Sequence, residues 1–138
     1  MSQPQSSPEA KPRSLQLAEL AARIADDNRA KDVKILDLRG LTSVFDFFVI
    51  ATGGSVRQLH AISDEIETAA RETLNDRKLG SEGYTQGGWV LIDFGDVVVH
   101  LFDADAREYY ALEDLWGQAP RVPFNSTGGL SVVEGTQS

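Results

Sequence analysis

The segment that most restricts the fold is FFVIAT, residues 47–52, which is apolar at every position before its final threonine. A strand with one solvated face alternates apolar and polar residues, and this segment does not. We therefore expect a central strand covered on both faces, which requires a layer of other elements on each side of a sheet. A chain of 138 residues is long enough to bury such a core as one domain.

Helical and strand patterns alternate along the rest of the chain, and they predict an α/β fold with a single mixed sheet and helices on its faces. The short turn at Phe94–Gly95 makes the last two strands antiparallel. The predicted order is α-β-β-α-β-β-α: a helix capped by Ser14, strands at 33–38 and 47–52, a helix at 56–74, two strands within 89–102, and a helix at 105–116.

Composition divides the chain into a folded middle and two tails. Residues 1–14 are rich in Ser, Pro and Gln and are predicted to be disordered, and residues 120–138 are predicted to be mostly flexible, with Val122 and Phe124 packing locally. Residues 15–119 form the predicted domain. No apolar run approaches the roughly 20 residues that span a bilayer, and the N-terminus lacks a signal-peptide core. The expected location is the cytoplasm, with no membrane contact.

The charge pattern favours a basic protein partner over nucleic acid. The formal net charge is −8, and the stretch 82–119 contains eight carboxylates against a single base, Arg107. Such a surface repels a phosphate backbone, because nucleic-acid binding depends on Lys and Arg. It attracts a cationic protein, although acidic surfaces are also common for solubility alone.

The stretch ATGGSVRQLHAISDEIE, residues 51–67, raises the possibility of nucleotidyl transfer, since transferases carry a Gly-Ser turn followed by paired carboxylates for Mg²⁺. However, Asp64 and Glu65 are adjacent on a predicted helix and point about 100° apart. Ser55 and Gln58 have the spacing of a capping box, which explains the turn without a ligand. With no cysteine and only two histidines in the chain, we expect no catalytic residues, metal or cofactor.

Aromatic residues gather in the last third of the chain, among the acidic ones. Trp and Tyr are common anchors of protein interfaces. Asp105 and Glu108 have capping-box spacing at the start of the last helix, and Tyr109, Leu112 and Trp116 are expected on one of its faces. Tyr109 and Trp116 are as consistent with core packing as with an interface. Tyr110 and Glu113 are expected on a different face of this helix and are the better interface candidates.

His100 lies within the predicted strand VVVHLF, on the same face as Val98. A single strand histidine is more often packed or hydrogen-bonded than catalytic. Asp93 and Asp96 flank the turn before this strand, where aspartates commonly bond the backbone. They could approach His100 across the hairpin, but no nucleophile accompanies them.

Three segments, in this order and spacing, closely resemble the ribosomal silencing factor family, also called Iojap-like. They are DFFVIATGGSVRQLHAISDEIE, WVLIDFGDVVVHLF and AREYYALEDLW, and the resemblance covers roughly residues 17–119. The family often has Asn where this chain has Gly54, and both residues tolerate left-handed backbone conformations.

The resemblance implies an α/β fold with a nucleotidyltransferase-like shape and no enzymatic activity. It implies binding to the large ribosomal subunit through a basic protein on the inter-subunit face, the fourteenth protein of that subunit. Bound there, the protein would block joining of the small subunit and repress translation when nutrients fall. It also implies a homodimer when the protein is free and, by likeness to organelle relatives, a role in ribosome assembly.

For partner contact we single out motif positions in the acidic, aromatic C-terminal half. The expected binding residues are Trp89, Asp93, Asp96, His100, Arg107, Tyr110 and Glu113, with Arg107 organising the carboxylates. A double substitution of Glu113 and Asp96 by Lys is expected to abolish binding and leave the fold intact. Two other hypotheses stay open: a nucleotidyltransferase-type enzyme, and an assembly scaffold for a non-ribosomal partner.

Overall fold

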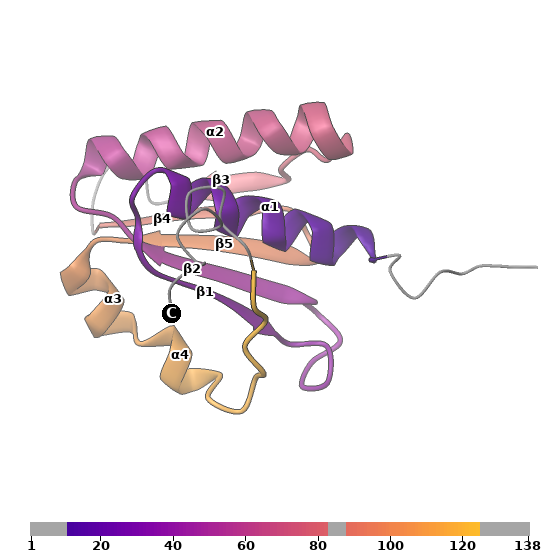
Figure 1. Ribbon diagram of the computed structural model, residues 1–138. Coiled ribbons are helices and arrows are strands. Elements are labelled where there is room, and N and C mark those ends of the chain that lie inside the picture. The colour runs from indigo at the N-terminus through magenta and orange to yellow at the C-terminus, as the bar shows by residue number, and fades with distance from the viewer. Residues whose placement is uncertain (1–10, 83–87, 125–138) are drawn as a thin grey trace, which may run out of the picture.

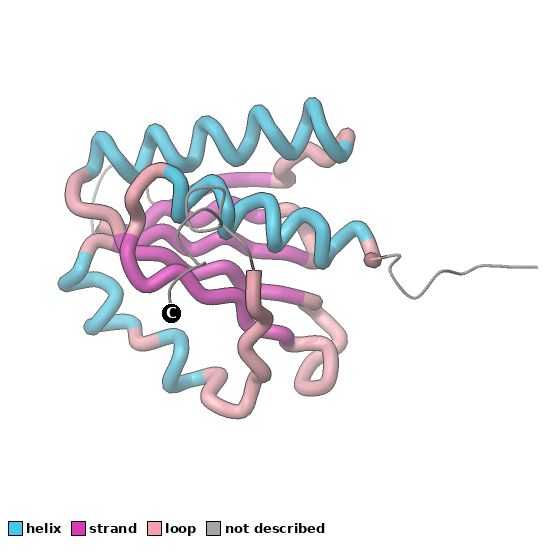
Figure 2. The backbone as a smooth tube through the Cα atoms, viewed as in Figure 1, coloured by secondary structure: helices cyan, strands magenta, loops and turns pink. Residues whose placement is uncertain are grey.

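The computed structural model describes residues 11–82 and 88–124. Its helices and strands form three layers, with α1 and α2 on one face of a sheet and α3 and α4 on the other (Figures 1 and 2). The elements are α1 (Arg13–Asp27), β1 (Lys31–Asp37), β2 (Phe47–Thr52), α2 (Val56–Leu74), β3 (Gly80–Glu82), β4 (Trp89–Asp93), β5 (Val97–Phe102), α3 (Ala104–Tyr110) and α4 (Leu112–Leu115).

The five strands form one mixed sheet in the order β1-β2-β5-β4-β3. Strands β2 and β5 are parallel, and the other neighbouring pairs are antiparallel. The two parallel strands lie at the centre, where every residue from Phe47 to Ala51 and from Val97 to Phe102 is buried. The prediction of a strand covered on both faces is confirmed, as is the hairpin with its turn at Gly95, whose φ is 100°.

The sheet separates two hydrophobic cores. The larger core lies under α1 and α2 and includes Phe47, Val49 and Leu101 from the sheet. The smaller core lies on the α3 and α4 side and includes Phe48, Ile50 and Phe102. Successive residues of each central strand therefore pack in opposite cores, because successive side chains of a strand point to opposite faces of the sheet.

The predicted element order is confirmed with two additions. Strand β3 extends the sheet beyond β4. The predicted helix over 105–116 is divided at Ala111, which adopts the left-handed conformation at φ 46° and ψ 49°. The helix predicted over 56–74 matches α2, and the Ser55 hydroxyl accepts a hydrogen bond from the Gln58 N–H at 3.1 Å.

Two predicted helix starts are wrong. Helix α1 follows Pro12 as its N-cap, and Ser14 is buried within the first turn. Helix α3 is capped by Asp103, whose carboxylate accepts from the Ala106 N–H at 2.8 Å, so Asp105 is not the cap. In each case the actual N-cap lies two residues before the predicted one.

Residues 120–124 lie along the edge of β1. The Pro120 carbonyl accepts from the Asp37 N–H at 2.8 Å, and the Val122 N–H donates to the Ile35 carbonyl at 2.9 Å. Val122 and Phe124 pack against the core under α1, as predicted. The tail predictions for residues 1–10 and 125–138 lie outside the described residues.

Candidate partner-binding surface

Five rings meet on the sheet face that carries α3. We call Phe48, Trp89, His100, Phe102 and Tyr110 the aromatic cluster. The strand register places Trp89 of β4 opposite Phe102 of β5, with ring centroids 5.3 Å apart. The Tyr110 ring, at the end of α3, lies 4.5 Å from that of Trp89, and Phe48 of β2 lies 4.5 Å from His100.

His100 is an internal member of the aromatic cluster and is only 4% exposed. Its Nδ1 accepts a hydrogen bond from Trp89 Nε1 at 3.3 Å. Burial lowers the pKa of His100 to about 3, so the imidazole is neutral near pH 7. A neutral, buried ring beneath Trp89 can orient the indole, but it offers a partner little direct contact.

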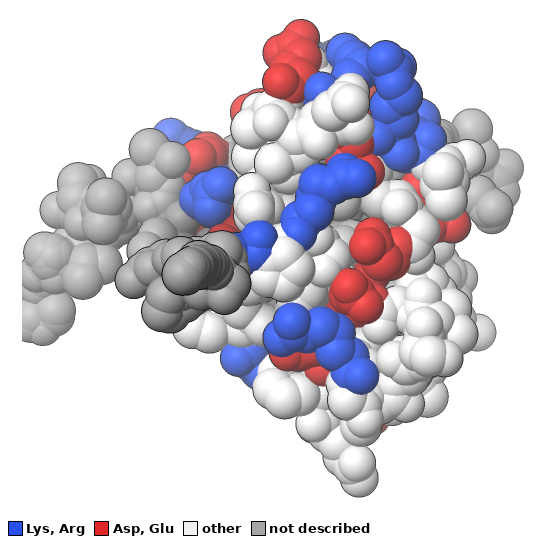
Figure 3. Space-filling model, turned by 90° about the vertical axis from the view of Figure 1, so that its right-hand side faces the viewer, with Lys and Arg blue, Asp and Glu red and all other residues white. Residues whose placement is uncertain are grey.

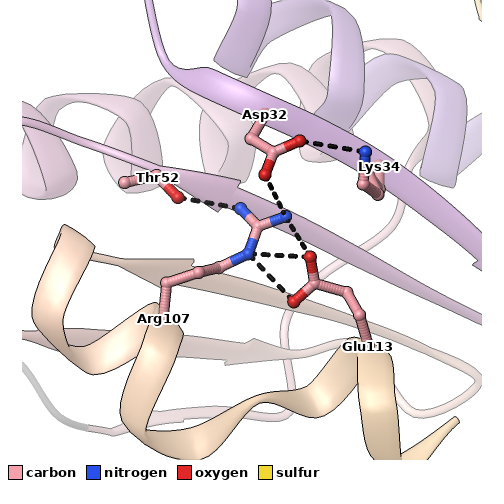
Figure 4. Close-up of polar contacts among 5 residues, drawn as sticks. All are labelled: Asp32, Lys34, Thr52, Arg107 and Glu113. Carbon is pink, nitrogen blue, oxygen red and sulfur yellow. Dashed lines mark hydrogen bonds and ion pairs between the residues drawn. The ribbon is translucent and has the colours of Figure 1, made fainter. Parts of the chain in front are cut away.

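Arg107 forms a second group together with Glu113, Thr52 and Asp32, which we call the Arg107 network (Figure 4). Its Nε donates to both Glu113 oxygens at 3.0 and 3.1 Å, and its Nη2 donates to Oε2 at 2.6 Å. The Nη1 group donates to the Thr52 hydroxyl at 2.8 Å. The Asp32 carboxylate lies 3.3 Å from Nη2.

The electrostatics of the Arg107 network favour fully ionised partners. Hydrogen bonding from Arg107 lowers the pKa of Glu113. A hydrogen bond from Lys34 lowers the pKa of Asp32, and the charge of Arg107 adds to this effect. Asp32 reaches the guanidinium from a bulge in β1 where it adopts a positive φ of 55°.

Exposed side chains surround these two groups. Tyr109 is 81% exposed, Tyr110 is 41% exposed, and Leu115 is 72% exposed. Exposed acidic residues lie on the same two helices: Asp105, Glu108 and Asp114. Trp116, by contrast, packs on Phe48 with ring centroids 6.0 Å apart, so the expectation that Tyr109 and Trp116 share one face is wrong.

Asp93 and Asp96 lie apart from the aromatic cluster, at the hairpin end of β4 and β5. The Asp93 carboxylate accepts from the Gly95 N–H at 2.7 Å and thereby stabilises the turn. Asp96 shares a hollow with Asp46, Asp76 and Arg13. Figure 3 faces this end of the molecule and shows acidic side chains lying between basic ones. Asp96 precedes His100 by four positions in the extended chain, a span of roughly 13 Å.

The structure therefore divides the seven predicted residues into three groups. Trp89, His100 and Tyr110 are together, Arg107 and Glu113 form the Arg107 network, and Asp93 and Asp96 are at the far end of the hairpin. The expected approach of the hairpin aspartates to His100 is wrong, since the register places Leu91 beside it. Glu113 is paired with the buried Arg107, so a Glu113→Lys exchange would place a second cation beside the guanidinium, and we now expect it to destabilise the fold.

Sequence reasoning missed Asp32 and Thr52 as parts of the site. Thr52 ends the central strand just before the Gly-Gly-Ser turn, where the carboxyl end of a strand commonly carries functional groups, so its position was a usable signal. Asp32 has no such sequence signal, because the bulge that turns it toward Arg107 has no distinctive residue pattern. Asp64 and Glu65 are exposed on α2, and no group of three or more His, Asp or Glu residues in the described parts of the chain could hold a metal.

Comparison with known proteins identifies the family of the chain. The model of the family described as "Ribosomal silencing factor during starvation", RsfS, matches residues 11–137. The chain belongs to the RsfS family. It is 46% identical over 108 residues to the ribosomal silencing factor RsfS of Halalkalibacterium halodurans, covering 78% of this chain and 91% of that protein.

The comparison extends to a plant protein and to a crystal structure. The chain is 37% identical over 109 residues to the chloroplastic protein Iojap of Arabidopsis thaliana, covering 79% of this chain and 45% of the plant protein. A crystal structure of a Chromobacterium violaceum protein matches with a TM-score of 0.71 at 38% identity, covering 80% of this chain and 91% of that one. The resemblance read from the sequence is therefore confirmed.

RsfS proteins are regulators and not enzymes, so the transferase hypothesis falls with the family assignment. The capping of α2 by Ser55 already accounts for the Gly-Gly-Ser turn. No helix within residues 11–82 and 88–124 combines the length and apolar character needed to cross a membrane.

Proposed function

We propose that this chain binds the large ribosomal subunit through a basic ribosomal protein on the inter-subunit face, the fourteenth protein of that subunit. Bound there, it blocks joining of the small subunit and represses translation. The RsfS family and its description as a silencing factor during starvation support this function. We further propose that the chain acts in the cytoplasm, without direct contact to nucleic acid or membrane.

The observation that carries the proposal is the exposed end of the aromatic cluster. Tyr110 and Tyr109 protrude from α3 beside the half-buried Trp89, with ring centroids of the two tyrosines 5.0 Å apart. Protein interfaces commonly combine such aromatic anchors with a polar rim. The rim here is acidic, formed by Asp105, Glu108 and Asp114, and it complements a cationic partner.

The proposed mechanism is steric exclusion. A folded chain placed on one subunit surface occupies volume that the other subunit needs, so binding and subunit joining become mutually exclusive. No bond is broken, and inhibition depends only on the free concentration relative to the dissociation constant. A standard interface of about 800 Å² on each partner would be sufficient.

We also propose that free chains form homodimers and that the family role in ribosome assembly extends to this chain. Leu41 and Leu115 are exposed and line one hollow, and this supports self-association because exposed apolar surface is commonly covered in solution. Size-exclusion chromatography with light scattering distinguishes a monomer from a dimer.

Cosedimentation with purified large subunits tests the proposed surface. Tyr110→Ala is expected to weaken binding by roughly 30-fold, the cost of about 2 kcal/mol for removing an interface anchor. Leu79→Ala is the matched control, because Leu79 is exposed but lies beside β3, away from α3. Unchanged binding by a folded Tyr110→Ala protein would place the interface elsewhere.

An affinity capture from cell lysate tests the remaining scaffold hypothesis. Capture of large-subunit proteins in proportion to ribosomal RNA supports ribosome binding. Capture of a single non-ribosomal protein, with no ribosomal component, would favour a scaffold for another partner.

A further inference from the structure

Arg107 lies on α3, the helix that carries Tyr109 and Tyr110 of the proposed binding surface, yet it is only 8% exposed. All three guanidinium nitrogens are engaged, by Glu113 of α4, Thr52 at the end of β2, and Asp32 in the β1 bulge. A buried, fully engaged guanidinium has little capacity to contact another molecule. Its partners instead belong to three different elements of the fold.

The Arg107–Glu113 pair spans the joint between α3 and α4. In a continuous helix, residues six positions apart point about 120° from each other and are about 9 Å apart along the axis, so they do not meet. The pair forms here because Ala111 adopts a left-handed conformation and redirects the chain. The ion pair is thus compatible with the bent joint and incompatible with one straight helix.

Without such a contact, the bent joint has little local support. Ala111 is not glycine, and a left-handed conformation is unfavourable for residues that carry a Cβ atom. Helix α4 has only four residues, and no side chain caps its N-terminus. The sequence of this region is consistent with a single helix from 105 to 116, which is the competing conformation.

The bent joint also determines where Tyr110 lies. Tyr110 directly precedes Ala111, and its ring contacts those of Trp89 and Phe102, at centroid distances of 4.5 and 5.9 Å. After the bend, α4 returns to the sheet, where Leu112 and Trp116 pack on the smaller core. Straightening the joint would move Trp116 away from Phe48.

We propose that Arg107 is a positioning residue: it holds the α3–α4 joint bent, and the bent joint presents Tyr110 and Trp89 to the partner. This inference rests on the proposed function, and it assigns to Arg107 a role other than direct partner contact. Asp32 and Thr52 contribute by satisfying the guanidinium donors that Glu113 leaves free.

A four-protein comparison tests this assignment: the wild type, Arg107→Met, Ala111→Gly and the double variant. Glycine accepts the left-handed conformation that the joint requires, so Ala111→Gly should favour the bend without the arginine. We expect Arg107→Met to weaken large-subunit binding about tenfold, and the double variant to return to within about threefold of the wild type.

The conformation of the joint is measured independently of ribosomes. The ¹³Cα and ¹³Cβ chemical shifts of Ala111 distinguish a left-handed residue from a helical one. We expect these shifts to move toward helical values in Arg107→Met. Arg57→Met is the control, because it removes an exposed arginine of α2 and should change neither binding nor the Ala111 shifts.

Three results would overturn the assignment. They are wild-type binding by Arg107→Met, unchanged Ala111 shifts in that variant, and a double variant that binds no better than Arg107→Met. If Arg107→Met fails to fold, Arg107→Lys and Glu113→Gln replace it, since both disrupt the bidentate pair with smaller changes. If the wild type itself does not bind large subunits, the proposed function fails, while the Ala111 shifts still decide whether Arg107 bends the joint.

Discussion

The imidazole of His100 has one nitrogen bonded to Trp89, while Nε2 is buried with no partner among the described residues. The surrounding rings of Phe48 and Phe102 offer no counter-charge to a protonated ring. Burial therefore keeps the imidazole neutral and makes the stability of the fold sensitive to acid.

The pH dependence of unfolding follows from this environment. The histidine titrates near pH 6.5 when unfolded and near pH 3 when folded, so the unfolded chain binds more protons between these values. Stability should fall as the pH drops below 6.5, by up to about 1.4 kcal/mol per pH unit. Urea unfolding at pH 7 and pH 5 measures this slope.

His100→Phe should flatten that slope between pH 6.5 and pH 5, while Arg57→Met, at an exposed position of α2, should retain it. The carboxylates with lowered pKa, including Glu113, contribute stability that is lost only at more acidic pH, as their folded pKa is approached. Equal slopes in the wild type and His100→Phe would show that another group carries the dependence.

At the scale of elements, local residue chemistry determines where helices begin. Asp103 precedes α3 with an extended backbone and bonds the Ala106 N–H, while Asp105 lies exposed in the first turn. A capping side chain contributes more than a charge near the helix dipole, because it satisfies a backbone donor directly.

The two aspartates provide a matched pair for testing the cap. Asp103→Ala should lower the free energy of unfolding by about 1 kcal/mol, and Asp105→Ala by less than about half of that. Chemical denaturation of both variants checks the order. The reverse order would mean that Asp105 caps the helix, as the sequence spacing suggests.

An element can be predicted from the sequence only when its residues form a recognisable pattern. Long periodic segments predicted α2 and the central strands correctly, because burial on defined faces leaves a pattern in the residues. Strand β3, only three residues long, has no such pattern. The sequence does not predict the bend at Ala111, because no glycine or proline stands there. The Arg107–Glu113 ion pair gives no signal either, because its members are six positions apart, a spacing at which residues of one helix do not meet.

The same reasoning explains the candidate site. Trp89 and His100 lie on the paired strands β4 and β5, and α3 brings Tyr110 to the Trp89 ring, so these three predicted residues lie together. The hairpin aspartates were singled out as motif positions in an acidic stretch, and neither a motif nor a charge pattern says which side chains lie together in space. The residues that share a hollow with Asp96, namely Asp46, Asp76 and Arg13, come from three other segments of the chain.

At the scale of the whole molecule, the net charge of −8 should assist association with a basic partner. Raising the salt concentration from about 50 to about 300 mM should slow binding to large subunits, because screening shortens the range of attraction. Stopped-flow kinetics with labelled protein measures the rate. A rate that rises with salt would contradict an acidic docking surface.

The central claim is that the folded chain prevents the two ribosomal subunits from joining without performing chemistry. Light scattering of mixed large and small subunits, titrated with this protein, measures it directly. We expect the yield of joined ribosomes to fall as the protein saturates the large subunit, with no nucleotide required. Full joining of large subunits that are saturated with the protein would contradict the account.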